Sequence, residues 1–236
     1  MAHAKGKEDT IRIAIGGTIG TGKSACINSL SEMLQSDPQI QLTTHSFYEP
    51  LSMWTTVRHH LDTTLFQFYK SDKQLDTPIA FQLKVLQSLI DREQKLLSHS
   101  GILLVERPLL DTIVFLETLH YYQRIPATII YQLKELVYTL AHSFPSPDMT
   151  IILNADPNVA LQRIKHRARR GEERLTLEYI THLQIIQRRN NLNHKGTHHI
   201  DTTHKTPQQV AKDILPLIYE KLKIENKEKE LHTSPP

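Results

Sequence analysis

The chain has little of several features that would assign it to a particular class of protein. Its single cysteine, Cys26, excludes an internal disulfide and suits a reducing compartment. Its formal net charge is only +3 at pH 7, which argues against a broad basic face for nucleic acid. No apolar run approaches the roughly 20 residues of a membrane-spanning helix, and the polar start "MAHAKGKEDT" is unlike a signal peptide. We therefore expect a cytoplasmic protein that binds neither nucleic acid nor a membrane.

The sequence also lacks internal repeats and long Gly/Ser-rich or Pro-rich linkers. Its 14 histidines show no spacing typical of metal ligands. The length of 236 residues fits one α/β domain with a sizeable core. We expect a flexible N-terminus over residues 1–10 and a single domain over 11–223. A disordered tail is expected over 224–236, where high charge density coincides with a lack of apolar spacing.

Short apolar segments alternate with segments of helical periodicity along the chain. The strand-like segments are 11–15, 41–49, 101–106, 149–155 and 197–201. The helix-like segments are one that ends near residue 35, and 52–69, 78–98, 109–123, 127–142, 157–168, 175–192 and 206–222. This alternation predicts an α/β fold of three layers, in which helices flank a five-stranded parallel sheet. Ligands of such sheets bind at the carboxyl ends of the strands.

The turn after the first strand satisfies the phosphate-binding pattern G-x-x-x-x-G-K-[ST]. It consists of Gly17, Thr18, Ile19, Gly20, Thr21, Gly22, Lys23 and Ser24. The glycines let backbone N–H groups approach phosphate oxygens, Lys23 reaches the terminal phosphates, and the Ser24 hydroxyl can ligate Mg²⁺. An apolar strand precedes this P-loop and a helix-compatible run follows it. We therefore predict a P-loop NTPase fold that binds ATP and Mg²⁺.

Motifs of other nucleotide enzymes are lacking. A GTPase would add N-K-x-D, and the nearest match, "NKEK" at 226–229, has the wrong last residue. A mechanical ATPase usually carries an apolar strand that ends in Asp-Glu, and none is evident. The length fits a small-molecule kinase better than either.

Charged residues end two of the predicted strands. Glu49 can take the proton of an attacking hydroxyl as general base, although a strand-end Glu is also often an ordinary surface residue. Glu106 and Arg107 can hold Mg²⁺ and neutralise the transferred phosphoryl group, respectively. The segment "RIKHRARRGEER" (163–174) fits a mobile arginine-rich lid over about 165–175, with a solvated basic helix end as the alternative.

These pieces together resemble the deoxynucleoside kinase family, whose members phosphorylate the 5′-hydroxyl of deoxyribonucleosides in nucleotide salvage. The resemblance covers about residues 11–222. It is carried by "GGTIGTGKS" (16–24), "EPLSMW" (49–54), "YK" (69–70) followed by "FQ" (81–82), "ER" (106–107), "RARRGE" (167–172) and "IDTT" (200–203). Each motif is weak alone, and their order and spacing together are specific.

The resemblance implies a role for each matching residue in the transfer of phosphate from ATP. Glu49 would be the base for the 5′-hydroxyl, and Arg107 would hold that oxygen and the incoming phosphoryl group. Glu106 and Ser24 would hold Mg²⁺.

The resemblance also implies contacts to the nucleoside. Trp54 would line the base pocket, Gln82 would make paired amide hydrogen bonds to the base, and Tyr69 and Glu172 would bind the sugar 3′-hydroxyl. Trp54 and Tyr69 can equally be ordinary core residues of amphipathic helices.

Arg167 and Arg169 would contact phosphates from the lid, and residues near Asp201 would border the adenine of ATP. Homodimers are common in the resembled family and would form here through the segments 109–123 and 127–142.

The stretch after Arg107 departs from the family pattern. Pro108 replaces the usual Ser, which suits the first turn of a helix. Five positions after the Arg, an Asp goes with cytosine or purine substrates; that position is Thr112 without a gap, or Asp111 with one residue deleted. The deletion is favoured because it also brings Phe115 into register. Asp111 would favour a base with an exocyclic amino group and Thr112 would allow thymine, so the preferred base stays open.

Two other functions remain open. A nucleoside monophosphate kinase of the thymidylate kinase type shares the fold, the P-loop, the lid and an acidic-Arg motif, but "EPLSMW" and "YK…FQ" favour the nucleoside enzyme. A non-catalytic nucleotide-binding regulator would need the P-loop but not Glu49, Glu106 or the lid arginines.

Overall fold

A five-stranded parallel sheet forms the middle of the protein. The computed structural model describes residues 10–55, 76–191 and 196–233. The strands are β1 (Thr10–Gly17), β2 (Thr44–Phe47), β3 (Gly101–Glu106), β4 (Met149–Asn154) and β5 (Thr197–Asp201). They lie in the order β2-β3-β1-β4-β5, and every neighbouring pair is parallel. The sheet confirms the predicted α/β fold, and β1, which carries the P-loop, is its central strand.

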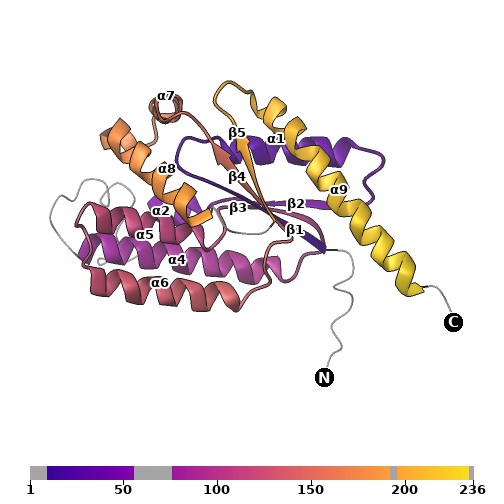
Figure 1. Ribbon diagram of the computed structural model, residues 1–236, viewed down its shortest axis with the longest axis horizontal. Coiled ribbons are helices and arrows are strands. Elements are labelled where there is room, and N and C mark those ends of the chain that lie inside the picture. Colours follow the sequence, from indigo (N-terminus) through magenta and orange to yellow (C-terminus); the bar gives the residue numbers. More distant parts are fainter. Residues whose placement is uncertain (1–9, 56–75, 192–195, 234–236) are drawn as a thin grey trace.

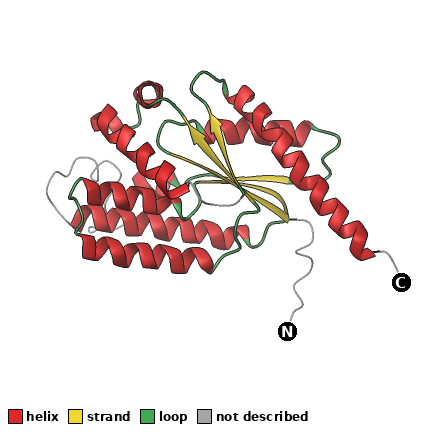
Figure 2. Ribbon diagram, in the orientation of Figure 1, coloured by secondary structure: helices red, strands yellow, loops and turns green. Residues whose placement is uncertain are grey.

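Helices cover both faces of this sheet in three layers (Figures 1 and 2). They are α1 (Lys23–Ser36), α2 (Leu51–Thr55), α4 (Asp76–Leu96), α5 (Asp111–Tyr121), α6 (Ala127–His142), α7 (Pro157–Arg167), α8 (Leu177–Asn191) and α9 (Pro207–Thr233), with a 3₁₀ turn at Glu172–Arg174. Helices α1 and α9 pack against each other on one face. Helix α4 lies on the other face, and α5 and α6 pack onto it.

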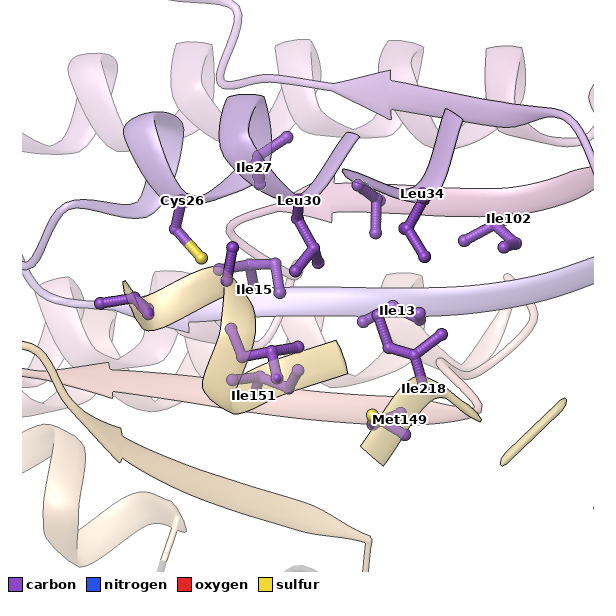
Figure 3. Close-up of a cluster of buried hydrophobic side chains, with 14 of the residues drawn as sticks. Ile13, Ile15, Cys26, Ile27, Leu30, Leu34, Ile102, Met149, Ile151 and Ile218 are labelled. Carbon is purple, nitrogen blue, oxygen red and sulfur yellow. The ribbon is translucent and has the colours of Figure 1, made fainter. Parts of the chain in front are cut away.

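The largest core lies between the sheet and the helices α1 and α9 (Figure 3). Side chains alternate along a strand, so Ile13 and Ile15 of β1 enter this core while Arg12 points to the other face. Helix α1 meets them with Ile27 and Leu30. Tight burial of these residues fixes β1 and the start of α1, which are the two elements that the P-loop joins.

Strand β2 and helix α9 differ most from their predicted extent. Strand β2 is shorter than expected because the Glu49 N–H donates to Oε2 of Glu106 at 3.4 Å rather than to a strand, and Pro50 has no N–H to donate. Helix α9 continues to Thr233, so its backbone is helical through most of the expected tail. The predicted helix 52–69 begins as α2, and its remainder lies outside the described residues, as does Tyr69.

No helix in the described part of the chain combines the length and the apolar character needed to cross a membrane.

Candidate active site

The P-loop turns tightly between β1 and α1. Gly20 and Gly22 have φ of +83° and +92°, a left-handed conformation that glycine adopts without strain. The Lys23 ammonium donates to the Thr18 carbonyl oxygen at 3.1 Å. Ser24 lies in the first turn of α1, and its hydroxyl donates to the Glu106 carboxylate. Backbone N–H groups, a lysine and a helix N-terminus thus converge where a polyphosphate would lie.

A cavity of about 490 Å³ opens beside this loop, at the carboxyl end of the sheet. Its walls include most of the residues predicted for the site: Ile19, Gly20, Thr21, Gly22, Lys23, Ser24, Glu49, Trp54, Gln82, Glu106, Arg107, Phe115, Arg167, Arg169 and Glu172. Gly17, Thr18, Asp111 and Asp201 do not line it. Residues far apart in the sequence therefore meet in one hollow, with the P-loop on one side and aromatic side chains on another.

Glu106 connects the P-loop to the third strand. Its Oε1 accepts a hydrogen bond from the Ser24 hydroxyl at 2.8 Å, and the carboxylate is buried. A hydroxyl and a carboxylate beside a phosphate loop are oxygen donors of the kind that Mg²⁺ takes together with substrate phosphates and water. The pair therefore fits the predicted magnesium site.

Arg107 is held on three sides. Its Nη1 donates to Oε1 of Glu49 at 3.2 Å, and its guanidinium carbon lies 4.1 Å from the ring centroid of Phe115 and 5.3 Å from that of Trp54. Its backbone has φ of +55°, which costs a non-glycine residue on the order of 1 to 2 kcal/mol. This backbone directs the guanidinium into the cavity instead of along the strand.

Glu49 is ionised and faces positive charge. Burial would raise the pKa of Glu49, but Arg107 and Lys23 outweigh burial and hold this pKa below its ordinary value. A partly exposed carboxylate that keeps its charge next to a phosphate-binding lysine can accept a proton from a hydroxyl brought into the cavity.

Asp111 lies beneath the P-loop rather than in the cavity. Its Oδ2 accepts a long hydrogen bond of 3.4 Å from the Gly17 N–H. Burial raises the pKa of Asp111 to about 6, against the opposing effect of Arg107 and Lys23. Thr112 is buried, and its hydroxyl has no partner among the described residues. Neither candidate for the base-selecting position thus lines the hollow.

Gln82 and Trp54 form the wall away from the P-loop. The indole N–H of Trp54 donates to the Ser88 hydroxyl at 2.8 Å, and Phe81 packs edge-on against the indole ring. The amide oxygen of Gln82 is buried and has no hydrogen-bond partner in the described part of the chain. An unsatisfied buried acceptor in a cavity wall is costly, so a ligand that donates to it would gain affinity.

The arginine-rich segment folds around one carboxylate. Arg167 and Arg169 both donate to the buried Glu172, at 2.7 and 3.1 Å. Both arginines still line the cavity. Glu172 therefore holds both guanidinium groups in the wall of the cavity that also contains the P-loop.

The loop after β5 meets the P-loop through Thr202, and α7 contributes Arg163; the sequence analysis included both residues only as members of longer motifs. The Thr202 hydroxyl donates to the Thr21 carbonyl oxygen at 3.0 Å, and Arg163 donates to the Thr202 hydroxyl at 3.0 Å. Arg163 precedes Arg167 by one helical turn, and this spacing was the available signal. Asp201 instead accepts from Thr203 and lines a separate surface hollow.

Comparison with known proteins identifies the family. The sequence pattern of the deoxynucleoside kinases matches residues 13–229. The chain belongs to the deoxynucleoside kinase family. The predicted resemblance is thereby confirmed, over slightly more of the chain than the motifs covered.

Two distant relatives of this deoxynucleoside kinase family member are thymidine kinases. It is 27% identical over 176 residues to the mitochondrial thymidine kinase 2 of Homo sapiens, and equally to that of Macaca fascicularis. The match covers 74% of this chain and 62% of each relative, which is less than two thirds of their length.

Solved structures of deoxyadenosine kinase from M. mycoides share the fold. One with the products dCMP and a flexible dCDP bound superposes with a TM-score of 0.72 at 20% identity, over 89% of this chain and 100% of that chain. Another structure, with dATP bound, superposes with a TM-score of 0.69 at 21% identity, over 87% of this chain and 100% of that chain. These structures confirm the P-loop kinase fold of the family.

Proposed function

We propose that this deoxynucleoside kinase family member transfers the γ-phosphoryl group of ATP to the 5′-hydroxyl of deoxyribonucleosides. One observation carries the proposal: a single cavity holds the P-loop, the Glu49–Arg107 pair and a wall of Trp54 and Gln82. The residues that would bind the phosphate donor, catalyse the transfer and bind the nucleoside acceptor thus line the same cavity. Family membership and the names of the relatives support the same reaction.

On the donor side, the P-loop would hold the phosphates of ATP. Backbone N–H groups and Lys23 would neutralise the β- and γ-phosphates, and the lid residues Arg167 and Arg169 would approach from the opposite wall. Ser24 and Glu106 would hold Mg²⁺, which supplies charge neutralisation on the phosphates when bound.

On the acceptor side, Glu49 would act as the general base. The nucleoside O5′ attacks the γ-phosphorus, the bond from that phosphorus to the bridging oxygen breaks, and ADP leaves. The proton of the 5′-hydroxyl passes to the Glu49 carboxylate, while Arg107 stabilises the charge on the moving phosphoryl group. Positioning and charge stabilisation supply most of the rate enhancement in such transfers.

Base recognition would rest on Gln82, because Asp111 and Thr112 do not line the cavity. A side-chain amide offers a donor next to an acceptor and can turn over to match the edge of adenine, cytosine or thymine. Phe115 and Trp54 supply apolar contacts to a planar ring. We therefore propose that more than one deoxynucleoside is accepted.

The product monophosphates would serve nucleotide salvage, for which we propose a cytoplasmic setting.

The test is an assay of the purified full chain with MgATP and each of dT, dC, dA, dG and dTMP, with product read by chromatography. We expect monophosphates from at least two of the nucleosides and no dTDP. A Lys23→Ala variant serves as the control for contaminating kinases and should form no product. Phosphorylation of dTMP alone would instead identify a monophosphate kinase, and ATP binding without turnover on any acceptor would identify a regulator.

A further inference from the structure

A cluster of buried charges lies behind the cavity, between β1, α4 and the end of β3. Glu93 of α4 is fully buried and is paired on one side with Arg12 of β1 and on the other with Arg92, at 3.0 Å from its Nη2. Neither Arg92 nor Glu93 lines the cavity. Charges buried in this way are expensive, and apolar side chains would stabilise the fold at least as well. The cluster therefore calls for an explanation other than stability.

Arg92 connects this cluster to the site through the backbone. It donates to the carbonyl oxygen of Glu106 and, at 2.9 Å, to that of Arg107. In the cavity, the Glu106 side chain accepts a hydrogen bond from Ser24, and the Arg107 side chain donates one to Glu49. The Arg107 N–H donates in turn to the Ile15 carbonyl oxygen at 2.9 Å. The left-handed backbone at Arg107 is thus fixed by hydrogen bonds on both of its peptide groups.

Arg12 serves as a control for Arg92 within the same cluster. It pairs with the same Glu93, but its other side-chain hydrogen bond goes to the Pro145 carbonyl oxygen at 2.9 Å, away from the site. Both arginines are buried to a similar extent. They differ chiefly in what they hold: Arg12 a surface loop, and Arg92 the Glu106–Arg107 backbone.

We propose that Arg92 is a positioning residue for phosphoryl transfer, which keeps the Arg107 guanidinium against Glu49 and over the Trp54 and Phe115 rings by fixing the two carbonyl groups. The inference rests on the proposed function for its catalytic consequence, and on the structure alone for the placement of Arg107. Arg92 touches no reacting atom and acts only through Arg107 and Glu106.

The experiment compares Arg92→Met with Arg12→Met in the full chain. Each variant leaves Glu93 with one guanidinium partner, so both should lower the melting temperature by similar amounts. Arg92→Met should also lower kcat for the best nucleoside by about 10- to 100-fold, since small misplacements of catalytic groups have effects of that size. Its ADP affinity should stay within about twofold of the wild type, because the P-loop is untouched. Arg12→Met should keep its kcat within about threefold of the wild type.

A second readout does not depend on turnover. Trp54 is the only tryptophan of the chain, and the Arg107 guanidinium lies over its ring. Loss of that contact changes indole emission, so Arg92→Met should shift the fluorescence spectrum in the same direction as Arg107→Gln. Arg12→Met should leave the spectrum as in the wild type. If Arg92→Met does not fold, Arg92→Lys, which keeps the charge but lacks the planar fork, takes its place.

The outcomes separate the two ideas. An Arg92 variant with wild-type kcat and wild-type emission overturns the positioning role and leaves the proposed function standing. A wild type that phosphorylates no nucleoside overturns the proposed function, and the emission shift then decides the placement of Arg107 by itself. If the Arg92 and Arg12 variants lose kcat equally and have the same emission spectrum, the positioning role of Arg92 is also overturned, and the cluster only stabilises the fold.

Discussion

At the scale of single residues, two carboxylates near Arg107 and Lys23 differ in their pKa. The pKa of Glu49 is lowered because the charges of Arg107 and Lys23 outweigh the effect of burial, and Arg107 also donates a hydrogen bond to it at 3.2 Å. The pKa of Asp111 is raised to about 6 because burial dominates and its hydrogen bond from Gly17 is long. Direct pairing thus keeps one carboxylate charged, as a base must be, while the other is protonated in mildly acidic solution.

The first prediction concerns the base. Glu49→Gln should lower kcat by about 10²- to 10⁴-fold, the usual contribution of a general base. ADP affinity, measured by calorimetry, should change by less than about twofold because the amide has the same shape as the carboxyl group and the P-loop is intact. Turnover near that of the wild type in a steady-state assay would refute the assignment of the base.

The second prediction concerns Asp111. Its pKa is raised from an ordinary 3.8 to about 6, so the folded state binds this proton more tightly than the unfolded state. The resulting stability is complete below about pH 4 and is lost as pH rises through about 6. The loss amounts to at most about 3 kcal/mol.

Asp111→Asn cannot ionise and should escape this loss. Relative to the wild type, its free energy of unfolding should rise by about 1 to 3 kcal/mol between pH 4.5 and pH 7.5. Urea unfolding of both proteins across this range provides the measurement. A difference in unfolding free energy that is the same at every pH would show that Asp111 does not titrate as described.

At the scale of elements, the P-loop is set by its contact with α7 as well as by its own turn. A Cβ added at Gly20 would lie 2.5 Å from the Ala160 carbonyl oxygen, whereas one at Gly22 would meet nothing within 4 Å. Both residues have similar positive φ. Gly20 therefore allows α7 to pack closely against the P-loop, whereas Gly22 is needed for the left-handed backbone of the turn and not for packing.

This contrast gives a third prediction. Gly22→Ala should cost about 1 kcal/mol of folding free energy from backbone strain alone. Gly20→Ala should cost about 1 to 3 kcal/mol more, because the methyl group pushes α7 away. Thermal unfolding without nucleotide measures both changes, so that contacts to phosphate play no part. Equal losses of folding free energy in the two variants would mean that α7 can shift to accommodate the added methyl group without measurable cost.

At the scale of the whole molecule, apolar side chains remain uncovered on α5 and α6. Tyr131 has 68% of its surface exposed, Tyr138 is exposed two turns further along the same side of α6, and Tyr121 is exposed at the end of α5. The sequence analysis expects a homodimer through the same segments. We propose that a second copy of the chain packs against these helices, because large apolar side chains exposed on neighbouring helices are typical of interfaces.

The fourth prediction tests the dimer. Analytical ultracentrifugation should give about twice the chain mass of 27.2 kDa for the wild type. Tyr131→Glu should shift the protein to the monomer without loss of secondary structure, because a charge buried in an interface is unfavourable. Ile185→Glu on α8, where Ile185 is also exposed, is the control and should leave the dimer intact. A monomeric wild type at micromolar concentration contradicts the proposal.

The sequence by itself determined the features whose chemistry is written in consecutive residues. Phosphate binding constrains a run of adjacent positions, so Gly17–Ser24 could be recognised from their spacing. Strand β3 was predicted with its correct bounds because the apolar run at 102–105, between Gly101 and Glu106, is typical of a short strand buried on both faces. Glu49 and Glu106–Arg107 could be placed near the ligand because parallel strands end at one edge of the sheet.

Only the tertiary structure decided contacts between distant residues and the direction of single side chains. One step along a helix turns a side chain by about 100°, so no spacing rule could tell that Asp111 lies under the P-loop while Thr112 points elsewhere. Arg92 reaches the Arg107 backbone from another element, and Thr202 reaches Thr21 across 181 positions. Such contacts depend on how the helices pack on the sheet, which the local pattern of the sequence does not encode.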